Sequence, residues 1–190
     1  MSTIADDTFN RHPFTVTDYY RMAEVGILIP GERVELIDGE IIDMPPIGSR
    51  HAGTVKHLAR ILQRAVGDNA IVQVQDPIRL SEYSEPEPDI ALVLPRADFY
   101  KSAHPGPGDV LLVIEVAETT LVYDRTIKAP LYARHGIPEC WIVDLKSRKL
   151  ERYRAPHELT YALVDRPELG EPIAPAALPN VGVGLGALFE

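Results

Sequence analysis

The sequence predicts an α/β fold, because one stretch of the chain has the pattern of a strand, a helix and a second strand. Residues 110–116 are a continuous apolar run, mostly β-branched or leucine and interrupted only by Glu115, as in a strand buried on both faces. Apolar residues at near-helical spacing over 127–135, followed by Gly136, predict a helix, and the apolar run 140–143 predicts the second strand. Within about 35 residues, this order is typical of one crossover unit.

Upstream of that unit, the sequence predicts a short helix and a hairpin. Thr15 or Thr17 can cap a helix over 18–24, because a threonine hydroxyl accepts a hydrogen bond from a free N–H of the first turn. An Asp-Gly dipeptide stands between two apolar-rich flanks within 33–44. This dipeptide favours the positive backbone φ of a two-residue turn, so we expect a hairpin there.

An amphipathic helix is predicted over 51–66, where apolar side chains form one stripe. Lys56, Arg60 and Arg64 recur every four residues on another face of it. A row of cations on a helix is most simply a solvated surface. In an acidic chain it is also a candidate nucleic-acid-binding ridge that contacts phosphates, and both interpretations stay open.

Shorter strands complete the predicted sheet. Where Pro77 interrupts an apolar run, we expect an edge strand, because proline cannot donate to a sheet ladder. The remaining predicted elements are a strand over 71–80 broken at that proline, a strand over 89–94, a loop over 95–108, a hairpin of 149–154 and 159–164 that turns at 155–157, and a docked C-terminal turn over 185–189.

The composition is typical of one globular domain in a reducing compartment. The chain has 190 residues, of which 45% are apolar, enough for a substantial core. Cys140 is the single cysteine, so no disulfide can form within the chain, and we expect a cytoplasmic protein. Residues 1–12 are expected to form a flexible N-terminal arm. No apolar run approaches the roughly 20 residues of a membrane span, so no membrane partner is expected.

Two acidic residues and one lysine have the pattern of a metal-assisted site. Asp89 opens an apolar strand, and Glu115 interrupts a buried one, where a carboxylate is costly unless it is paired or binds a cation. Carboxylates that converge at neighbouring strand ends suit Mg²⁺ or Mn²⁺. Such a metal activates water, which Lys128 could orient or help to deprotonate, and the lysine could also offset the charge of the transition state. Strand-end carboxylates also cap helices or form salt bridges, so spacing alone leaves a structural role open.

Several short blocks occur in a specific order along the chain. They are Pro-Glu-Pro-Asp89, Ile114-Glu115-Val116, Tyr123-Asp124-Arg125 with Lys128, and the run from Leu131 to Asp144 that contains Trp141. In this order they resemble the Uma family of restriction endonucleases, within the PD-(D/E)xK nuclease superfamily. The resemblance covers the chain from about Phe14 to Phe189, and the last block is its most specific part.

The resemblance implies a restriction-endonuclease-like core, with a central mixed sheet flanked by helices and a metal site at one edge. A single domain over 13–190 would contain it. The implied activity is Mg²⁺- or Mn²⁺-dependent endonucleolytic hydrolysis of DNA phosphodiester bonds, and we expect a homodimer by analogy with related nucleases. The alternative is a catalytically silent nuclease-fold protein that acts as a nucleic-acid-binding or assembly module. The formal net charge of −9 argues against binding nucleic acid through bulk charge alone.

The resemblance also implies roles for individual residues. Asp89 matches the motif aspartate and Glu115 the second acidic metal ligand, and the backbone carbonyl of Val116 is a further candidate ligand. The usual lysine position holds Ala117 here, so the strict D/E-x-K lysine is missing. Lys128, on the following helix, matches the lysine that replaces it.

Three further residues belong to the implied site. Glu35, on the predicted hairpin, matches the acidic residue that some superfamily members add from an N-terminal element, although it could simply pair with a nearby cation. Asp124 and Tyr132 belong to the same local motif as Lys128 and are expected to support that lysine.

Pro130 sets an expectation for the helix that carries Lys128. Proline is tolerated in the first helical turn, where the backbone N–H has no helical partner. We therefore expect the helix to begin near Thr126, which places Lys128 in its first turn. The alternative is a start at Thr119, in which case Pro130 would kink the helix and change the geometry of the lysine.

The histidines give weaker indications of function. His51 and His104 could each bind a metal, but neither has a second histidine at ligand spacing. We expect both to be loop or capping residues.

Overall fold

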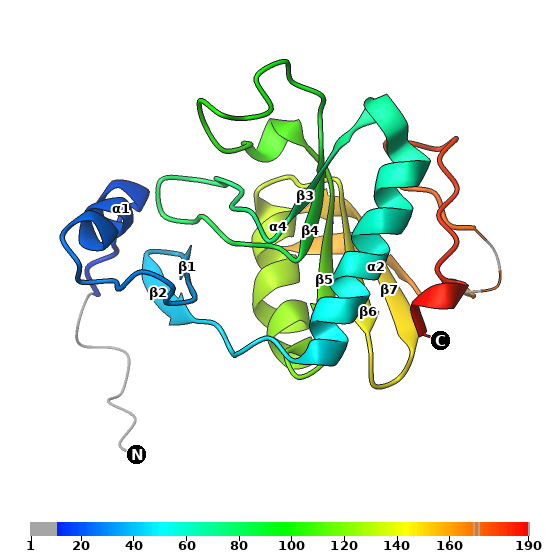
Figure 1. Ribbon diagram of the computed structural model, residues 1–190, viewed down its shortest axis with the longest axis horizontal. Helices are drawn as coiled ribbons and strands as arrows, with labels where there is room; N and C mark the ends of the chain where they lie inside the picture. Colours follow the sequence, from blue (N-terminus) through cyan, green and yellow to red (C-terminus); the bar gives the residue numbers. More distant parts are fainter. Residues whose placement is uncertain (1–10, 169, 171, 190) are drawn as a thin grey trace.

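A six-stranded mixed sheet forms the centre of the described part of the chain, which comprises residues 11–168, 170 and 172–189 of the computed structural model (Figure 1). Its strands, in spatial order, are β3 (Ile71–Val74), β4 (Ile90–Val93), β5 (Val110–Ala117), β6 (Glu139–Asp144), β7 (Lys149–His157) and β8 (Thr160–Asp165). The β5–β6 pair is parallel, and the other four pairs are antiparallel. The predicted α/β fold with a central mixed sheet, including the crossover unit, is therefore confirmed.

Helices cover both faces of this sheet (Figure 1). The long helix α2 (Ser49–Val66) packs on one face and the short helix α4 (Ala129–Arg134) on the other. Each face of the sheet has a hydrophobic core, one under α2 and one under α4. Alternate residues of β5 pack into these two cores, because successive side chains of a strand point to opposite faces. Ile114 packs with the α2 core, whereas Val113 packs with the α4 core. By the same alternation Glu115 lies on the α4 side of the sheet.

The N-terminal elements lie together at one side of the sheet (Figure 1). Thr15 caps α1 (Val16–Glu24) through a reciprocal capping box with Asp18. The predicted hairpin is present as β1 (Val34–Ile37) and β2 (Glu40–Asp43), joined by the expected Asp-Gly turn with positive φ at both residues. This hairpin forms a two-stranded sheet of its own, and an isolated antiparallel bridge joins Leu36 of β1 to Glu85.

The helix after β5 begins earlier than the sequence predicts. Helical turns start at α3 (Leu121–Tyr123), continue through a π turn (Asp124–Lys128) and end in α4. In the π turn, the N–H of Ala129 donates to the carbonyl of Asp124, five residues earlier. The wider turn precedes Pro130, so the helix accommodates the proline, and the expected start near Thr126 is wrong.

Two other local predictions are also corrected. Residues 78–80 are not a strand, because Ile78 and Leu80 donate their N–H groups to the carbonyls of Pro86 and Ser84 instead of to the sheet. The edge strand β3 ends before that segment, at Val74. Strand β7 runs through 155–157, and the turn of the last hairpin lies at 158–159.

The C-terminal part of the chain docks on the α2 face of the sheet. Ile173, Val183 and Leu185 belong to the α2 core, and a final helical turn covers Gly186–Phe189, as predicted. No helix in the described ranges is long and apolar enough to cross a membrane. The predicted arm over 1–12 lies outside the described residues except for its last two, and the single domain over 13–190 stays a prediction.

Candidate active site

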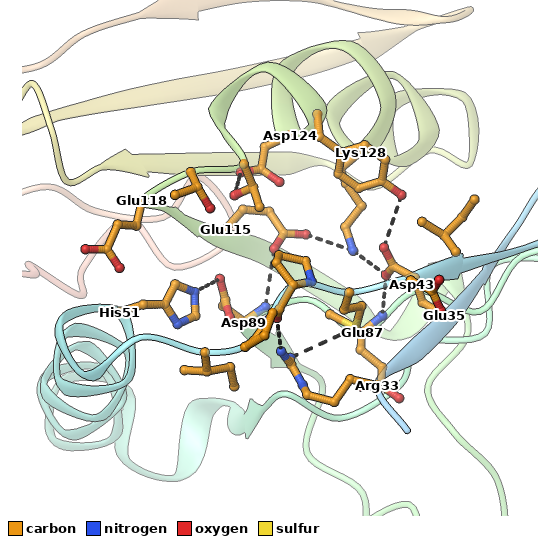
Figure 2. A pocket seen from close by; sticks show the side chains of 18 of the residues that line it. Arg33, Glu35, Asp43, His51, Glu87, Asp89, Glu115, Glu118, Asp124 and Lys128 are labelled. Carbon is orange, nitrogen blue, oxygen red and sulfur yellow. Dashed lines mark hydrogen bonds and ion pairs between the residues drawn. The ribbon is translucent and has the colours of Figure 1, made fainter. Parts of the chain in front are cut away.

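A cavity of about 400 Å³ lies where β4 begins and β5 ends, between the β1–β2 hairpin and the start of α2 (Figure 2). We call it the Glu115 cavity. Its lining residues are Arg33, Glu35, Ile42, Asp43, Met44, Pro45, Pro46, Ile47, Gly48, His51, Glu87, Asp89, Glu115, Glu118, Thr119, Thr120, Tyr123, Asp124 and Lys128. Seven of these side chains are acidic and only two, Arg33 and Lys128, are permanently cationic. The cavity therefore carries a large excess of carboxylate groups.

The antiparallel pairing of β4 with β5 brings Asp89 next to Glu115. Asp89 precedes β4, and Ile90 pairs with Ile114, so the start of one strand lies beside the end of the other. The backbone N–H of Val116 donates to Asp89 Oδ2 at 2.8 Å, and the N–H of Asp89 lies 3.4 Å from Glu115 Oε2. Two acids that are 26 residues apart in sequence thus share one end of the sheet.

Lys128 connects the two acidic groups on the other wall of the cavity. Its Nζ lies 2.6 Å from Glu35 Oε2 and 3.4 Å from Glu115 Oε1, and the residue is only 2% exposed (Figure 2). Burial alone would lower the pKa of this lysine, but the Glu115 and Glu35 carboxylates outweigh it and raise the pKa. Lys128 is therefore a fixed cation and hydrogen-bond donor, not a base.

Glu115 is the most perturbed carboxyl group of the cavity. Burial raises its pKa to about 8, although Lys128 acts in the opposite direction. The hydroxyl of Tyr132, on α4, donates to Glu115 Oε1 at 2.5 Å. A cation bound near this carboxylate would favour its charged form.

The two predicted supporting residues take different positions. Tyr132 holds Glu115 directly, and its ring centroid lies 5.9 Å from the Nζ of Lys128. Asp124 lines the cavity and accepts a hydrogen bond from the hydroxyl of Thr120 at 2.7 Å. Burial raises the pKa of Asp124 to about 6. The positive charge of Lys128 acts against this rise, so the two residues interact electrostatically.

His51 lines the cavity, although the sequence analysis considered it as a metal ligand and expected a loop or capping residue instead. It lies in the first turn of α2, and its Nε2 is 3.0 Å from Asp89 Oδ2. This contact is the largest cause of a raised His51 pKa. Gln75 donates to the other oxygen of Asp89 at 3.1 Å. His51 and Asp89 are 38 residues apart, so no local spacing pattern indicates the pair.

Glu118, on the turn after β5, lies at the start of α2. A Cβ at Gly48, the N-cap of α2, would be 3.1 Å from Glu118 Oε2. The positive end of a helix favours a carboxylate in this place. The negative charge that Glu118 adds to the cavity wall is thus partly balanced by the helix.

The predicted nucleic-acid-binding ridge lies outside the cavity. Lys56, Arg60 and Arg64 are all exposed along α2, and none of them lines the Glu115 cavity. Only the first turn of α2, through His51, lines the cavity, and the three cations lie farther along the helix. A role of these three cations in binding nucleic acid stays a prediction.

The donor set at the cavity fits a hard divalent cation. Asp89 and Glu115 present carboxylate oxygens, which Mg²⁺ and Mn²⁺ prefer. Within the described ranges, no three His, Cys, Asp or Glu side chains are already arranged around one metal position. Both oxygens of Asp89 accept hydrogen bonds, so a metal would replace part of this network. Val116 contacts Asp89 through its N–H, and ligation by its carbonyl stays a prediction.

A solved structure shows the fold of the chain, and a family profile shows its family. A crystal structure described as a "putative nuclease belonging to DUF820", from Anabaena variabilis, superposes with a TM-score of 0.68 at 16% identity, over 93% of this chain and 98% of that one. None of the curated proteins matches the sequence. The profile of the Uma2 family, described as "Putative restriction endonuclease", matches residues 16–186. The chain, whose sheet end gathers two acids and a buried lysine, therefore belongs to the Uma2 family.

Proposed function

We propose that the protein is a Mg²⁺- or Mn²⁺-dependent endonuclease that hydrolyses DNA phosphodiester bonds. The observation that carries the proposal is the meeting of Asp89, Glu115 and Lys128 in one acidic cavity, from three separate elements of the chain. Membership of the Uma2 family supports it independently.

Asp89 and Glu115 are the residues that would hold the metal. When bound, the ion would supply Lewis acidity, lower the pKa of a water and stabilise charge on the phosphoryl oxygens. His51 and Gln75 hold the carboxylate of Asp89 in place, and Tyr132 does so for Glu115. These hydrogen bonds orient the ligands, a role that is usual for groups behind a metal ligand.

Lys128 would contribute a positive charge to the reaction. Its raised pKa keeps the amine protonated, so it cannot take a proton from water at neutral pH. It can donate a hydrogen bond to the attacking water or to a phosphoryl oxygen, where negative charge develops. Glu35 is a positioning residue in this scheme, because it holds the ammonium group at 2.6 Å.

Substrate binding requires a change in the charge of the cavity. A phosphodiester brings a further negative charge to a wall that already has seven acidic side chains. Divalent cations would offset this repulsion, and the exposed cations of α2 would attract the DNA backbone. We therefore expect cleavage to depend strictly on a divalent ion and to weaken at high salt.

A plasmid-nicking assay tests the proposal. Supercoiled DNA is incubated with the wild type in Mg²⁺, in Mn²⁺ and in EDTA, and nicked product is expected only with the metals. Asp89→Asn should abolish nicking and weaken Mn²⁺ binding in calorimetry, whereas Asp68→Asn, an equal change at an exposed site, should change neither. Lys128→Ala should abolish nicking but retain Mn²⁺ binding, with the exposed Lys101→Ala as its control.

One observation favours the alternative, a catalytically silent binding or assembly module. Lys128 is already paired with Glu35 and Glu115, and Asp89 is already hydrogen bonded, so these side chains have partners without a metal. Wild-type protein that binds DNA but does not nick it in Mg²⁺ or Mn²⁺ would establish this alternative. The homodimer is proposed in either case, and light scattering on the eluting protein would measure its mass.

A further inference from the structure

A second cavity, of about 340 Å³, lies between α1, the loop after it and the segment 85–87. We call it the Glu85 cavity. Its acidic lining residues are Glu32, Glu85 and Glu87, and no lysine, arginine or histidine lines it within the part of the chain that the structure describes. Glu87 also lines the Glu115 cavity, so the two cavities are neighbours.

Glu85 is the unusual residue of this cavity. It is only 2% exposed, and its backbone N–H donates to the carbonyl of Leu36 at 2.8 Å, which fixes it against β1. Its Oε1 accepts a hydrogen bond from the hydroxyl of Tyr20 at 2.6 Å. Its Oε2 is buried and has no hydrogen-bond partner among the described residues. A buried carboxylate oxygen without a donor is costly, so a bound group that supplies one would stabilise the site.

The remaining walls of the cavity are aromatic and apolar. The rings of Tyr19 and Tyr20 meet edge to face, with 5.8 Å between their centroids. The hydroxyl of Tyr19 donates a hydrogen bond to the carbonyl of Val34. Leu28 and Ile29 also line the cavity, and Ile29 is 63% exposed. Aromatic faces and aliphatic side chains suit the carbon stem of a ligand and attract its cationic head.

We propose that the Glu85 cavity binds an organic cation, an ammonium or guanidinium group on an apolar stem. The cationic head donates to Glu85 Oε2, and the stem packs against the tyrosine rings and Ile29. A hydrated metal ion fits less well, because two other carboxylate oxygens nearby are already engaged: Tyr20 donates to Glu85 Oε1, and the N–H of Ile29 donates to Glu32 Oε2. The cation can come from a free amine or from a lysine or arginine side chain of a partner protein.

Binding measured by nuclear magnetic resonance tests this proposal without any nuclease assay. Wild-type protein is titrated with n-butylammonium and, separately, with the neutral isostere 1-butanol, and the ring signals of Tyr19 and Tyr20 are followed. We expect saturable shifts with the ammonium and at least about tenfold weaker binding of the alcohol, the loss expected for one charge-assisted hydrogen bond. Equal binding of both ligands, or no binding of either, would overturn the proposal.

Glu85→Gln gives the matching change in the protein. The amide keeps the shape and an oxygen for the Tyr20 hydroxyl, so we expect about 10- to 100-fold weaker binding of n-butylammonium. Glu24→Gln makes the same charge change on α1 outside this cavity and should bind like the wild type. Unchanged affinity in Glu85→Gln would contradict the proposal. If that variant does not fold, the comparison of ammonium with alcohol on the wild type decides.

A competition experiment between n-butylammonium and a lysine-containing peptide distinguishes the two possible sources of the cation. An acetyl-Gly-Lys-Gly-amide peptide should displace n-butylammonium from the wild type. Tighter binding of the peptide would support a partner's side chain, and tighter binding of the free amine would support a small-molecule ligand.

Discussion

Replacing Lys128 by methionine is the sharpest test of how the Glu115 cavity is held together. Methionine keeps most of the volume of the stem but removes the ammonium group, which lies 2.6 Å from Glu35 and 3.4 Å from Glu115. Both carboxyl groups are at most 5% exposed, so water cannot replace the lost cation. Breaking a buried ion pair from one side costs about 3–5 kcal/mol. For a chain of this size, that corresponds to a fall in Tm of about 6–20 °C.

The loss should depend on pH in a defined direction. Burial already raises the folded-state pKa of Glu115 to about 8 in the wild type, above the unfolded value of roughly 4.3, and removing Lys128, which lowers this pKa, raises it further. Groups whose folded pKa is raised make the folded state bind more protons, so the variant loses stability as the pH rises. The difference between wild type and variant should therefore be larger at pH 8, where Glu115 ionises in the wild type, than at pH 5.

Urea unfolding in EDTA at both pH values measures the two effects. Lys101→Met, at an exposed lysine, is the control and should change the free energy of unfolding by no more than about 0.5 kcal/mol. A loss of less than about 1 kcal/mol in Lys128→Met at pH 8, or a loss that grows as the pH falls, would refute the electrostatic argument.

Three other substitutions test the fold. Leu58→Ala, in the α2 core where Leu58 is 0% exposed, should lower the free energy of unfolding by about 2–5 kcal/mol in urea. Burial would raise the pKa of Glu151, but hydrogen bonds, of which the one from Arg125 has the largest effect, lower it to about 2. Glu151→Gln should therefore lower the free energy of unfolding by up to about 3 kcal/mol at pH 7. That cost should shrink as the pH falls from about 4.5 to about 2 in acid titration. Gly39→Ala should lower Tm by several degrees, because its Cβ would lie 2.4 Å from that of Pro13 and its φ is +77°.

The elements predicted correctly are those that local patterns determine. The β5–helix–β6 unit follows from apolar runs of fixed period, and the β1–β2 hairpin follows from one dipeptide that accepts positive φ. The favoured start of the helix after β5 was too late in the chain, because a π turn leaves no apolar signature and the rule for Pro130 assumes a regular α-helix.

The candidate site was predictable only in part. Glu115 is conspicuous because it interrupts an apolar strand, and its alternation with neighbours on β5 sets the face to which it points. His51 and Glu85 have ordinary local sequence contexts, and their significance comes from partners 38 and 65 residues away. Contacts of this kind follow from the packing of whole elements, which the spacing of residues in one chain does not specify.

The π turn also explains how two side chains of one helical segment can both donate hydrogen bonds to the carboxylate of Glu35. Tyr123 and Lys128 reach the two oxygens of Glu35, at 3.2 Å and 2.6 Å, although they are five residues apart. In a regular α-helix, side chains at that separation diverge by about 140° around the axis. The five-residue hydrogen-bonding repeat of the π turn brings them into line instead. The extra residue in this helical turn thus determines the direction in which the ammonium group of Lys128 points.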